Sequence, residues 1–223
     1  AGIRVTEGAG DEQVVFGVVA VHVGEDRFDD IGGECWHEIY GTRFGDAQPW
    51  TMAITPDTKD WTWTSERKCP ECGFDAGTVD VNTVGELVRE NAAAWKPALA
   101  RGDARQRPDD HTWSPLEYAA HVRDVHRVYA QRLQRFLVED NPTFINWDQD
   151  NAAITDRYNE QDPEQVVAEL LEAAEAAASG FDAVPADAWN RTAERSDGAT
   201  FTLTSFARYY LHDIVHHRWD VEH

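Results

Sequence analysis

Two segments of the sequence carry the same helix-initiation signal. In "SPLE", Ser114 is a good N-cap, Pro115 fits the first helical position and Glu117 completes a capping box. The segment "DPEQ" at residues 162–165 repeats this arrangement. Apolar residues then recur at intervals of three and four after both signals, which predicts two long amphipathic helices.

Two further helices complete the pattern. One begins near Thr83, which stands at capping-box spacing from Glu86, and continues to about Leu99. The last spans roughly residues 203–221 and begins with a threonine cap. Four long helices in 223 residues predict an all-α four-helix bundle. The predicted long connections are 100–113, 139–162 and 180–202, and the second of these has room for a short helix of its own.

The first 79 residues differ from this helical part. Residues 1–50 are rich in glycine and contain the β-branched run 14–23, which predicts a small N-terminal extension of mixed or β character. Residues 51–79 resemble an extended linker that carries a Cys-x-x-Cys knuckle. The predicted organisation is therefore an extension at 1–50, a linker at 51–79 and a bundle at 80–223.

Charge and composition exclude some partners. A net charge of -21 repels phosphate backbones, so nucleic acid is not an expected partner. No apolar run reaches the ~18 residues that a membrane span needs, so no membrane partner is expected. The chain has 3 Cys, an odd number, and two of them form a Cys-x-x-Cys pair, which favours a reducing compartment and a cytoplasmic location.

The end of the sequence, "RYYLHDIVHHRWDVEH", gathers histidines on the last predicted helix. His212 and His216 are four residues apart, so their imidazoles lie on one helical face and can reach one metal ion at ~2.1 Å each. His217 lies about 100° further around the helix. We therefore expect His217 to be a surface residue or a group that supports a ligand.

A third ligand is available on the second predicted helix. His121 lies on its apolar stripe, between Tyr118 and Val125, and this helix can face the last one across the core. A hydrogen-bonded core histidine is the alternative interpretation. Three neutral imidazoles would leave open coordination positions, which are typical of catalytic rather than structural metal sites.

The segments "WSPLEYAAHVRDVHRVYAQRL" and "FARYYLHDIVHHRWDV" resemble the DinB-like superfamily of metal-binding four-helix bundles over roughly residues 80–223. This group includes mycothiol- and bacillithiol-dependent S-transferases and the mycothiol-dependent maleylpyruvate isomerase. Its pattern is one histidine on the second helix and HxxxH on the last. The resemblance implies that His121, His212 and His216 hold a divalent metal, with zinc as the first choice and nickel or iron as alternatives.

The resemblance also implies an activity. We expect a metal-dependent enzyme that activates a mycothiol-like, low-molecular-weight thiol for S-transfer to, or isomerisation of, an electrophilic small molecule. The alternatives are a non-catalytic, stress-associated metal-binding protein and a metal-dependent hydrolase or oxygenase that uses no thiol. The expected partners are the substrate and the small thiol, and a homodimer is left open.

Five polar or aromatic residues are candidates to line the same cavity: Tyr209, Asp124, Trp147, Asp148 and Asp213. Tyr209 and Asp124 are candidate catalytic residues, and Trp147 and Asp148 are candidate substrate-binding residues. Asp213 or Asp220 is a candidate to orient a ligand imidazole. The alternative for each of them is an ordinary solvated surface group.

The segment "KCPECGFDAG" places Cys69 and Cys72 in a knuckle typical of half a zinc ribbon. A closed zinc site needs four ligands, and Cys35 and His37 are the candidates for the other two. A reversible dithiol and a pair of reduced, packed cysteines are the alternatives.

Overall fold

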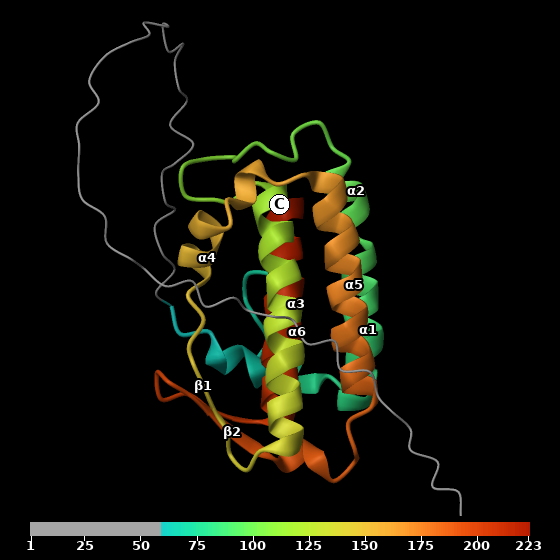
Figure 1. The fold of residues 1–223 in the computed structure, drawn as a ribbon, viewed down its shortest axis with the longest axis vertical. Helices are drawn as coiled ribbons and strands as arrows, with labels where there is room; N and C mark the ends of the chain where they lie inside the picture. The colour runs from blue at the N-terminus through green and yellow to red at the C-terminus, as the bar shows by residue number, and fades with distance from the viewer. Residues whose placement is uncertain (1–58) are drawn as a thin grey trace, which may run out of the picture. The chain divides into compact units, whose positions relative to one another are not determined.

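The computed structural model describes residues 59–223, and most of that part is helical (Figure 1). The predicted four-helix bundle is confirmed. Its members are α1 (Val84–Ala93) with its continuation α2 (Trp95–Leu99), α3 (Pro115–Val138), α5 (Pro163–Asp182) and α6 (Leu203–Glu222). The predicted extension at residues 1–50 lies outside the described residues.

The shorter elements lie between and before these helices. They are the 3-10 helices η1 (Thr62–Ser65), η2 (Ala76–Thr78), η3 (Val81–Thr83), η4 (Tyr158–Glu160) and η5 (Ala188–Asn190), the helix α4 (Gln149–Thr155), and the strands β1 (Thr143–Phe144), β2 (Thr192–Arg195) and β3 (Thr200–Thr202). Helix α4 occupies the connection in which a short helix was expected.

The predicted caps form at the starts of three bundle helices. At α3, the Ser114 backbone N–H donates to the Glu117 carboxylate at 2.9 Å, and the Glu117 N–H donates to the Ser114 hydroxyl at 3.3 Å. The Asp162 carboxylate accepts from the backbone N–H groups of the first turn of α5 at 3.0 Å. Thr202 and Ser205 form a capping box at α6. These caps satisfy backbone donors that a helix start leaves unpaired.

The first bundle helix is less regular than predicted. The Thr83 side chain makes no cap; its hydroxyl donates to the backbone oxygen of Asp80 at 2.8 Å instead. The helix also breaks at Ala94, between α1 and α2. Pro97 explains the break, because proline has no N–H to donate to the carbonyl of Ala93 one turn earlier.

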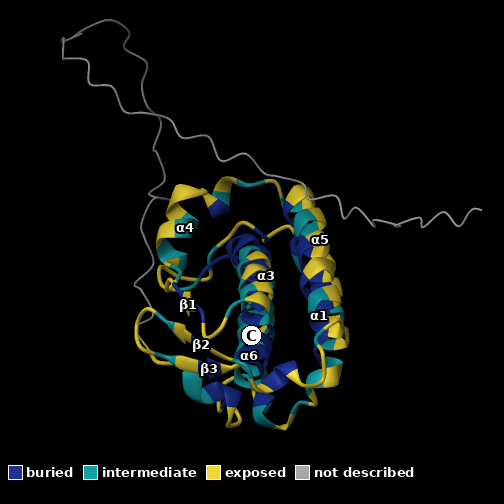
Figure 2. Ribbon diagram, turned by 60° about the horizontal axis from the view of Figure 1, so that its bottom comes forward, coloured by how far each residue is buried: buried dark blue, intermediate teal, exposed yellow. Residues whose placement is uncertain are grey.

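The bundle helices bury one side and expose the other. Figure 2 shows α1 and α5 with buried positions toward the other helices and exposed positions outside. Helices α1 and α5 pack closely at Gly85, where a Cβ atom would lie 2.9 Å from the backbone oxygen of Ala178. Glycine at this position therefore permits the short distance between the two helices.

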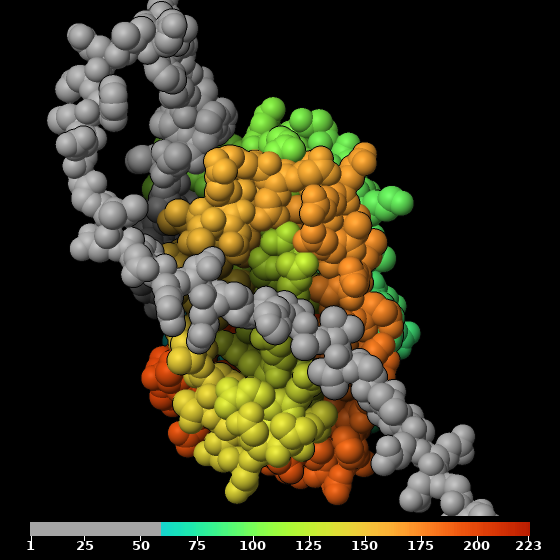
Figure 3. Space-filling view, in the orientation of Figure 1, coloured from blue at the N-terminus to red at the C-terminus, as the bar shows by residue number. Residues whose placement is uncertain are grey.

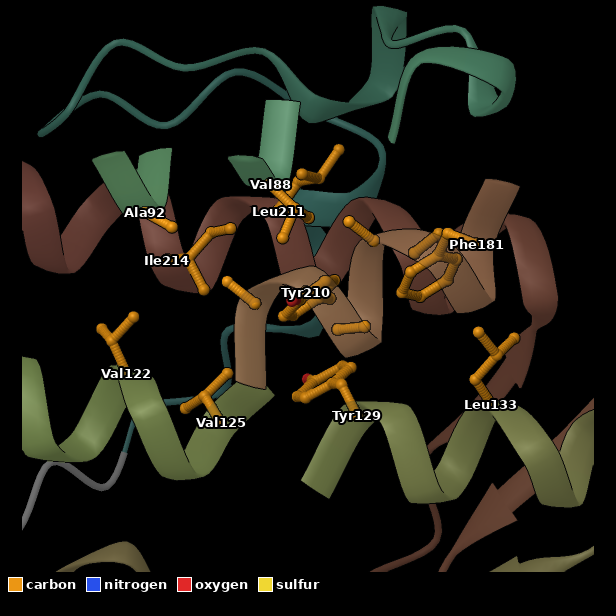
Figure 4. Packing of buried hydrophobic residues seen from close by; sticks show 14 of the residues in the cluster. Val88, Ala92, Val122, Val125, Tyr129, Leu133, Phe181, Tyr210, Leu211 and Ile214 are labelled. Atoms are coloured by element: carbon orange, nitrogen blue, oxygen red, sulfur yellow. The ribbon is translucent and has the colours of Figure 1, made fainter. Parts of the chain in front are cut away.

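An aromatic stack fills the middle of the core (Figure 4). The ring of Tyr210 on α6 stacks on Tyr129 of α3 with centroids 4.6 Å apart, and on Phe181 of α5 at 5.5 Å. Phe206, one turn earlier on α6, also stacks on Tyr129, with centroids 4.6 Å apart. Because these rings come from three helices, the stack fixes how α6 lies against α3 and α5.

A small sheet, which the sequence did not indicate, joins the connection after α3 to the connection between α5 and α6. Strand β2 pairs in parallel with β1 and antiparallel with β3, with Ala193 opposite Phe201. The β2–β3 connection turns at Gly198, which has a φ of +93°. The strands hold the start of α6 against the end of α3.

The segment before α1 packs on the last helix. Elements η1 and η2, at residues 62–78, both contact α6. The knuckle between them is closed by two backbone bonds, from the N–H of Cys69 to the oxygen of Phe74 at 2.9 Å and from the N–H of Gly73 to the oxygen of Cys69 at 3.0 Å. This part of the predicted linker therefore brings cysteines to α6.

No helix within residues 59–223 is both long enough and apolar enough to cross a membrane.

Candidate metal centre

One cluster of ligand-type side chains lies between α3 and α6. It consists of His121, Asp213 and His217, whose ligand atoms lie within 4.8 Å of one another, and we call it the bundle cluster. Nε2 of His217 lies 3.1 Å from Oδ1 of Asp213, and Nε2 of His121 lies 3.8 Å from the same oxygen. Asp213 and His217 are four residues apart on α6, so both point toward α3.

Aromatic side chains enclose the bundle cluster. Trp147 stacks on the His121 ring with an interplanar angle of 3° and centroids 5.4 Å apart, and Trp113 lies against the same ring at 5.2 Å. Tyr118 packs against His217 at 5.2 Å. His121 has no exposed surface, and neither of its ring nitrogens has a hydrogen-bond partner among the described residues.

The charges of the bundle cluster are coupled. Burial lowers the pKa of His121, so this imidazole is neutral. Burial acts to lower the pKa of His217 as well, but hydrogen bonds to Asp213 and Asp220 raise it to about 9. Burial acts to raise the pKa of Asp213, but the neighbouring imidazoles outweigh burial and hold it well below its usual range. Asp220 also orients His217, since its Oδ2 lies 3.0 Å from Nδ1.

A second cluster joins α6 to the knuckle. Its members are Cys69, Cys72, His212 and His216, with ligand atoms again within 4.8 Å of one another, and we call it the knuckle cluster. Burial lowers the pKa of His212 to about 4 and also lowers that of His216, so both imidazoles are neutral. A neutral imidazole and a thiolate are the usual protein ligands of zinc.

The predicted set of three histidine ligands is divided between these clusters. His121 lies in the bundle cluster, whereas His212 and His216 lie in the knuckle cluster. The reason is the phase of the helix: adjacent residues differ by about 100° in direction, so the pair at 212 and 216 and the pair at 213 and 217 face different neighbours. His217, expected at the surface or behind a ligand, lies directly beside Asp213 and His121.

Asp124 and Tyr209 occupy different surroundings. The carboxylate of Asp124 accepts from Arg123 and Arg127 at 2.9 Å and from the Tyr158 hydroxyl at 2.7 Å. Burial acts to raise the pKa of Asp124, but these bonds, above all that from Arg123, lower it. Tyr209 stacks on Phe201 of β3 with centroids 5.6 Å apart, and the guanidinium of Arg195 lies 5.8 Å from its ring centroid. The catalytic roles of both residues stay predictions.

Trp147 and Asp148 also lie in different surroundings. Trp147 contacts His121 and lines an open pocket of about 580 Å³ between α3, α4 and α5, together with Asp124. Figure 3 shows this region as a green surface of α3 recessed between gold α4 and orange α5. Asp148 is exposed and caps α4, where it accepts from the Asn151 N–H at 2.9 Å. Trp147 is thus the residue that connects this pocket with the bundle cluster.

The proposed zinc partners Cys35 and His37 lie outside the described residues. Cys69 and Cys72 are free thiols that meet α6 histidines. Burial raises the pKa of Cys72 to about 11. A reactive dithiol usually has a lowered thiol pKa, and the dithiol and packed-cysteine alternatives stay predictions.

Sequence reasoning did not identify Asp213 and His217 as ligands of the bundle cluster. The signal was present in "HDIVHH", which contains two pairs at a spacing of four residues, His212 with His216 and Asp213 with His217. Only the pair of histidines was considered as a ligand pair. Tyr118 was interpreted as part of an apolar stripe, and Trp113 lies in a predicted connection, so neither sequence position indicated a contact with a ligand.

The remaining histidine of α3 is a core residue. His126 is fully buried, and its Nδ1 lies 2.5 Å from the Tyr210 hydroxyl. Burial lowers the pKa of His126 to about 3. The folded protein therefore keeps this imidazole neutral at pH values at which an unfolded chain, with an ordinary histidine pKa near 6.5, would bind a proton.

This difference predicts acid sensitivity. Stability from neutral His126 is fully present above about pH 6.5 and is lost as the pH falls toward about 3, because only the unfolded chain gains the proton. The loss between pH 8 and pH 5 is about 2 kcal/mol. We expect His126→Asn, which keeps a polar group near Tyr210, to flatten the urea-unfolding free energy over this range relative to the wild type. An identical pH slope in both proteins would contradict the prediction.

The fold and the bundle cluster together define a class of protein. It is a four-helix bundle in which histidine and carboxylate side chains from two helices form a candidate metal site. The model of the DinB superfamily matches residues 86–221, and the chain belongs to this superfamily. A search of curated protein sequences finds no match.

The chain is also similar to a solved structure, YfiT from Bacillus subtilis, described as "a probable metal-dependent hydrolase with an unusual four-helix bundle topology". The TM-score is 0.57 at 18% sequence identity, and the match covers 64% of this chain and 84% of that one. At this identity the likeness concerns the fold.

Proposed function

We propose that the chain is a metal-dependent enzyme whose bundle cluster holds a divalent cation and activates a low-molecular-weight thiol, of the mycothiol type, for S-transfer or isomerisation. The observation that carries the proposal is His121. Its ring is completely buried, and neither ring nitrogen has a hydrogen-bond partner within residues 59–223. Burying unpaired polar atoms is costly, and binding to a cation would remove that cost.

The donor set fits a catalytic ion. Two imidazoles and one carboxylate leave coordination positions open, and such sets suit zinc, nickel and iron. When bound, the cation would supply positive charge that lowers the pKa of a thiol or of water at an open position. The choice among these metals stays a prediction, with zinc as the first choice.

The chain's own residues would prepare this site. Asp220 holds the His217 ring through Nδ1, so that Nε2 faces Asp213 and His121. Trp147, stacked on the His121 ring, and Trp113, packed against it at a tilt, help to keep water from this imidazole. The open pocket beside Trp147 offers room for an electrophilic substrate, and Asp124 on its wall is a candidate for proton transfer.

Hydrolysis without a thiol is the second candidate. The observation in its favour is Asp213, because a set of two histidines and one carboxylate is also the donor set of zinc hydrolases. The description of YfiT as a probable metal-dependent hydrolase adds support of the same kind.

The test compares two substrates with the metal-loaded protein. A test electrophile such as monochlorobimane is supplied with mycothiol or another small thiol, and an activated ester is supplied without any thiol. We expect consumption of the electrophile that requires the thiol, stops after chelation and is lost in His121→Ala. The variant His111→Ala, which removes an exposed loop imidazole, is the control and should retain full activity.

Each other outcome has a defined meaning. Turnover of the ester alone would replace the first proposal with hydrolysis. No turnover of either substrate by the metal-loaded protein would overturn both, and would favour a non-catalytic metal-binding role. A cytoplasmic location and a homodimer stay predictions.

A further inference from the structure

The knuckle cluster is separate from the proposed active site and has the ligands of a closed metal centre. Two thiols come from the loop between η1 and η2, at Cys69 and Cys72, and two imidazoles come from one face of α6, at His212 and His216. We propose that these four side chains hold a structural zinc ion that fastens the segment before α1 to α6. The proposal is independent of the proposed activity.

One pair of ligand atoms already has the separation that a shared zinc ion requires. Sγ of Cys69 lies 3.7 Å from Nδ1 of His216. Zinc bonds of ~2.3 Å to sulfur and ~2.0–2.1 Å to nitrogen, at a tetrahedral angle, place these two atoms ~3.6 Å apart. The separation therefore needs almost no change for both atoms to bind one ion.

The buried imidazoles add a second, independent observation. Nε2 of His212 is buried and has no hydrogen-bond partner among the described residues. On His216, Nε2 faces carboxylate oxygens of Glu71 at 3.6 Å and of Asp220 at 3.7 Å, which leaves Nδ1 directed at the sulfur. Carboxylates behind a ligand imidazole commonly fix its orientation in metal sites.

The loop is shaped to present both sulfurs. Gly73 has a φ of +74°, a left-handed conformation that costs glycine little, and its position directly after Cys72 lets the chain turn back. A backbone hydrogen bond from Phe74 reaches the Cys72 sulfur. Trp61 of the same segment covers the imidazoles, with ring centroids 5.6 Å from His212 and 5.0 Å from His216.

This site would support the bundle cluster through α6. His212 is followed directly by Asp213, and His216 by His217, so the two ligand sets alternate along one helix. An ion that holds one face of α6 against the knuckle therefore fixes the rotation of the helix. The other face, with Asp213 and His217, is then held toward His121.

The test uses the full chain loaded with cobalt(II) in place of zinc. We expect thiolate-to-cobalt charge-transfer absorption and strong tetrahedral d–d bands from the wild type. Both signals should disappear in Cys72→Ser and in His212→Ala, and both should persist in His121→Ala, which changes only the bundle cluster. Zinc content after dialysis should be lower by one ion per chain in Cys72→Ser than in the wild type.

The controls separate this site from the alternatives. Cys35→Ser should keep the cobalt bands and the zinc content; loss of the bands there, with retention in His212→Ala, would overturn the proposed ligand set. Absence of any thiolate-to-cobalt absorption in the wild type would overturn the site itself. If a variant fails to fold, zinc release from the wild type by a thiol-specific mercurial decides: one ion released supports the site, and none contradicts it.

Discussion

Replacing His217 with alanine is expected to lower turnover more than ~100-fold, since changes even to groups behind a metal ligand typically cost ~10–100-fold. His217 supplies the nitrogen nearest to Asp213 in the bundle cluster and is held from behind by Asp220. Without it, two donors remain, and the proposed cation loses both affinity and orientation. Steady-state turnover and bound metal are the measurements, with circular dichroism as the check on folding.

Matched variants make this prediction specific. Asp220→Asn keeps the ligand but weakens its support, so we expect a smaller loss of ~10–100-fold. His111→Ala should behave as the wild type. Full activity and full metal content in His217→Ala, with the loss found instead on removal of the His212 or His216 ring in a folded protein, would restore the three-histidine set as the active centre.

Truncation of Tyr210 to alanine should lower the free energy of unfolding by about 3–5 kcal/mol. The ring stacks on Tyr129 and Phe181, so its removal opens a cavity where three helices meet (Figure 4). Urea unfolding measures the change. Val138→Ala, at a side chain that is 80% exposed, is the control and should change the unfolding free energy little.

The hydroxyl of Tyr210 has its own, smaller effect. Tyr210→Phe keeps the stacked ring but leaves Nδ1 of His126 without its partner at 2.5 Å. We expect Tyr210→Phe to cost about 1–3 kcal/mol, the usual penalty for a buried unpaired polar group.

For Tyr210→Ala, an unfolding free energy within about 1 kcal/mol of that of the wild type would contradict the assignment of this stack as the centre of the core.

The helices were predictable because their signals are local. The Ser114 and Asp162 caps, each followed by proline, act within one turn, and the apolar stripes of α3 and α5 repeat over many residues. The strands β1, β2 and β3 were not predictable, because each has 2 to 4 residues and is defined by partners far away in the sequence. The break at Ala94 could have been inferred from Pro97.

The site was predictable only in part for a different reason. Spacing alone shows that His212 and His216 share a face, and equally that Asp213 and His217 do. Which face meets His121 depends on how α6 is rotated in the bundle, and core side chains such as Tyr210 determine that rotation. The meeting of Cys69 with His216, 147 residues apart, depends on the same rotation and left no local signal.

Because ligands of the two clusters alternate along α6, the register of this helix determines both ligand sets. Inserting a single alanine between Tyr210 and His212 would turn everything after it by about 100° relative to the core. His212 and His216 would turn away from the thiols, and Asp213 would no longer face His121. An insertion or deletion of one residue inside α6 would therefore disrupt both ligand sets at once.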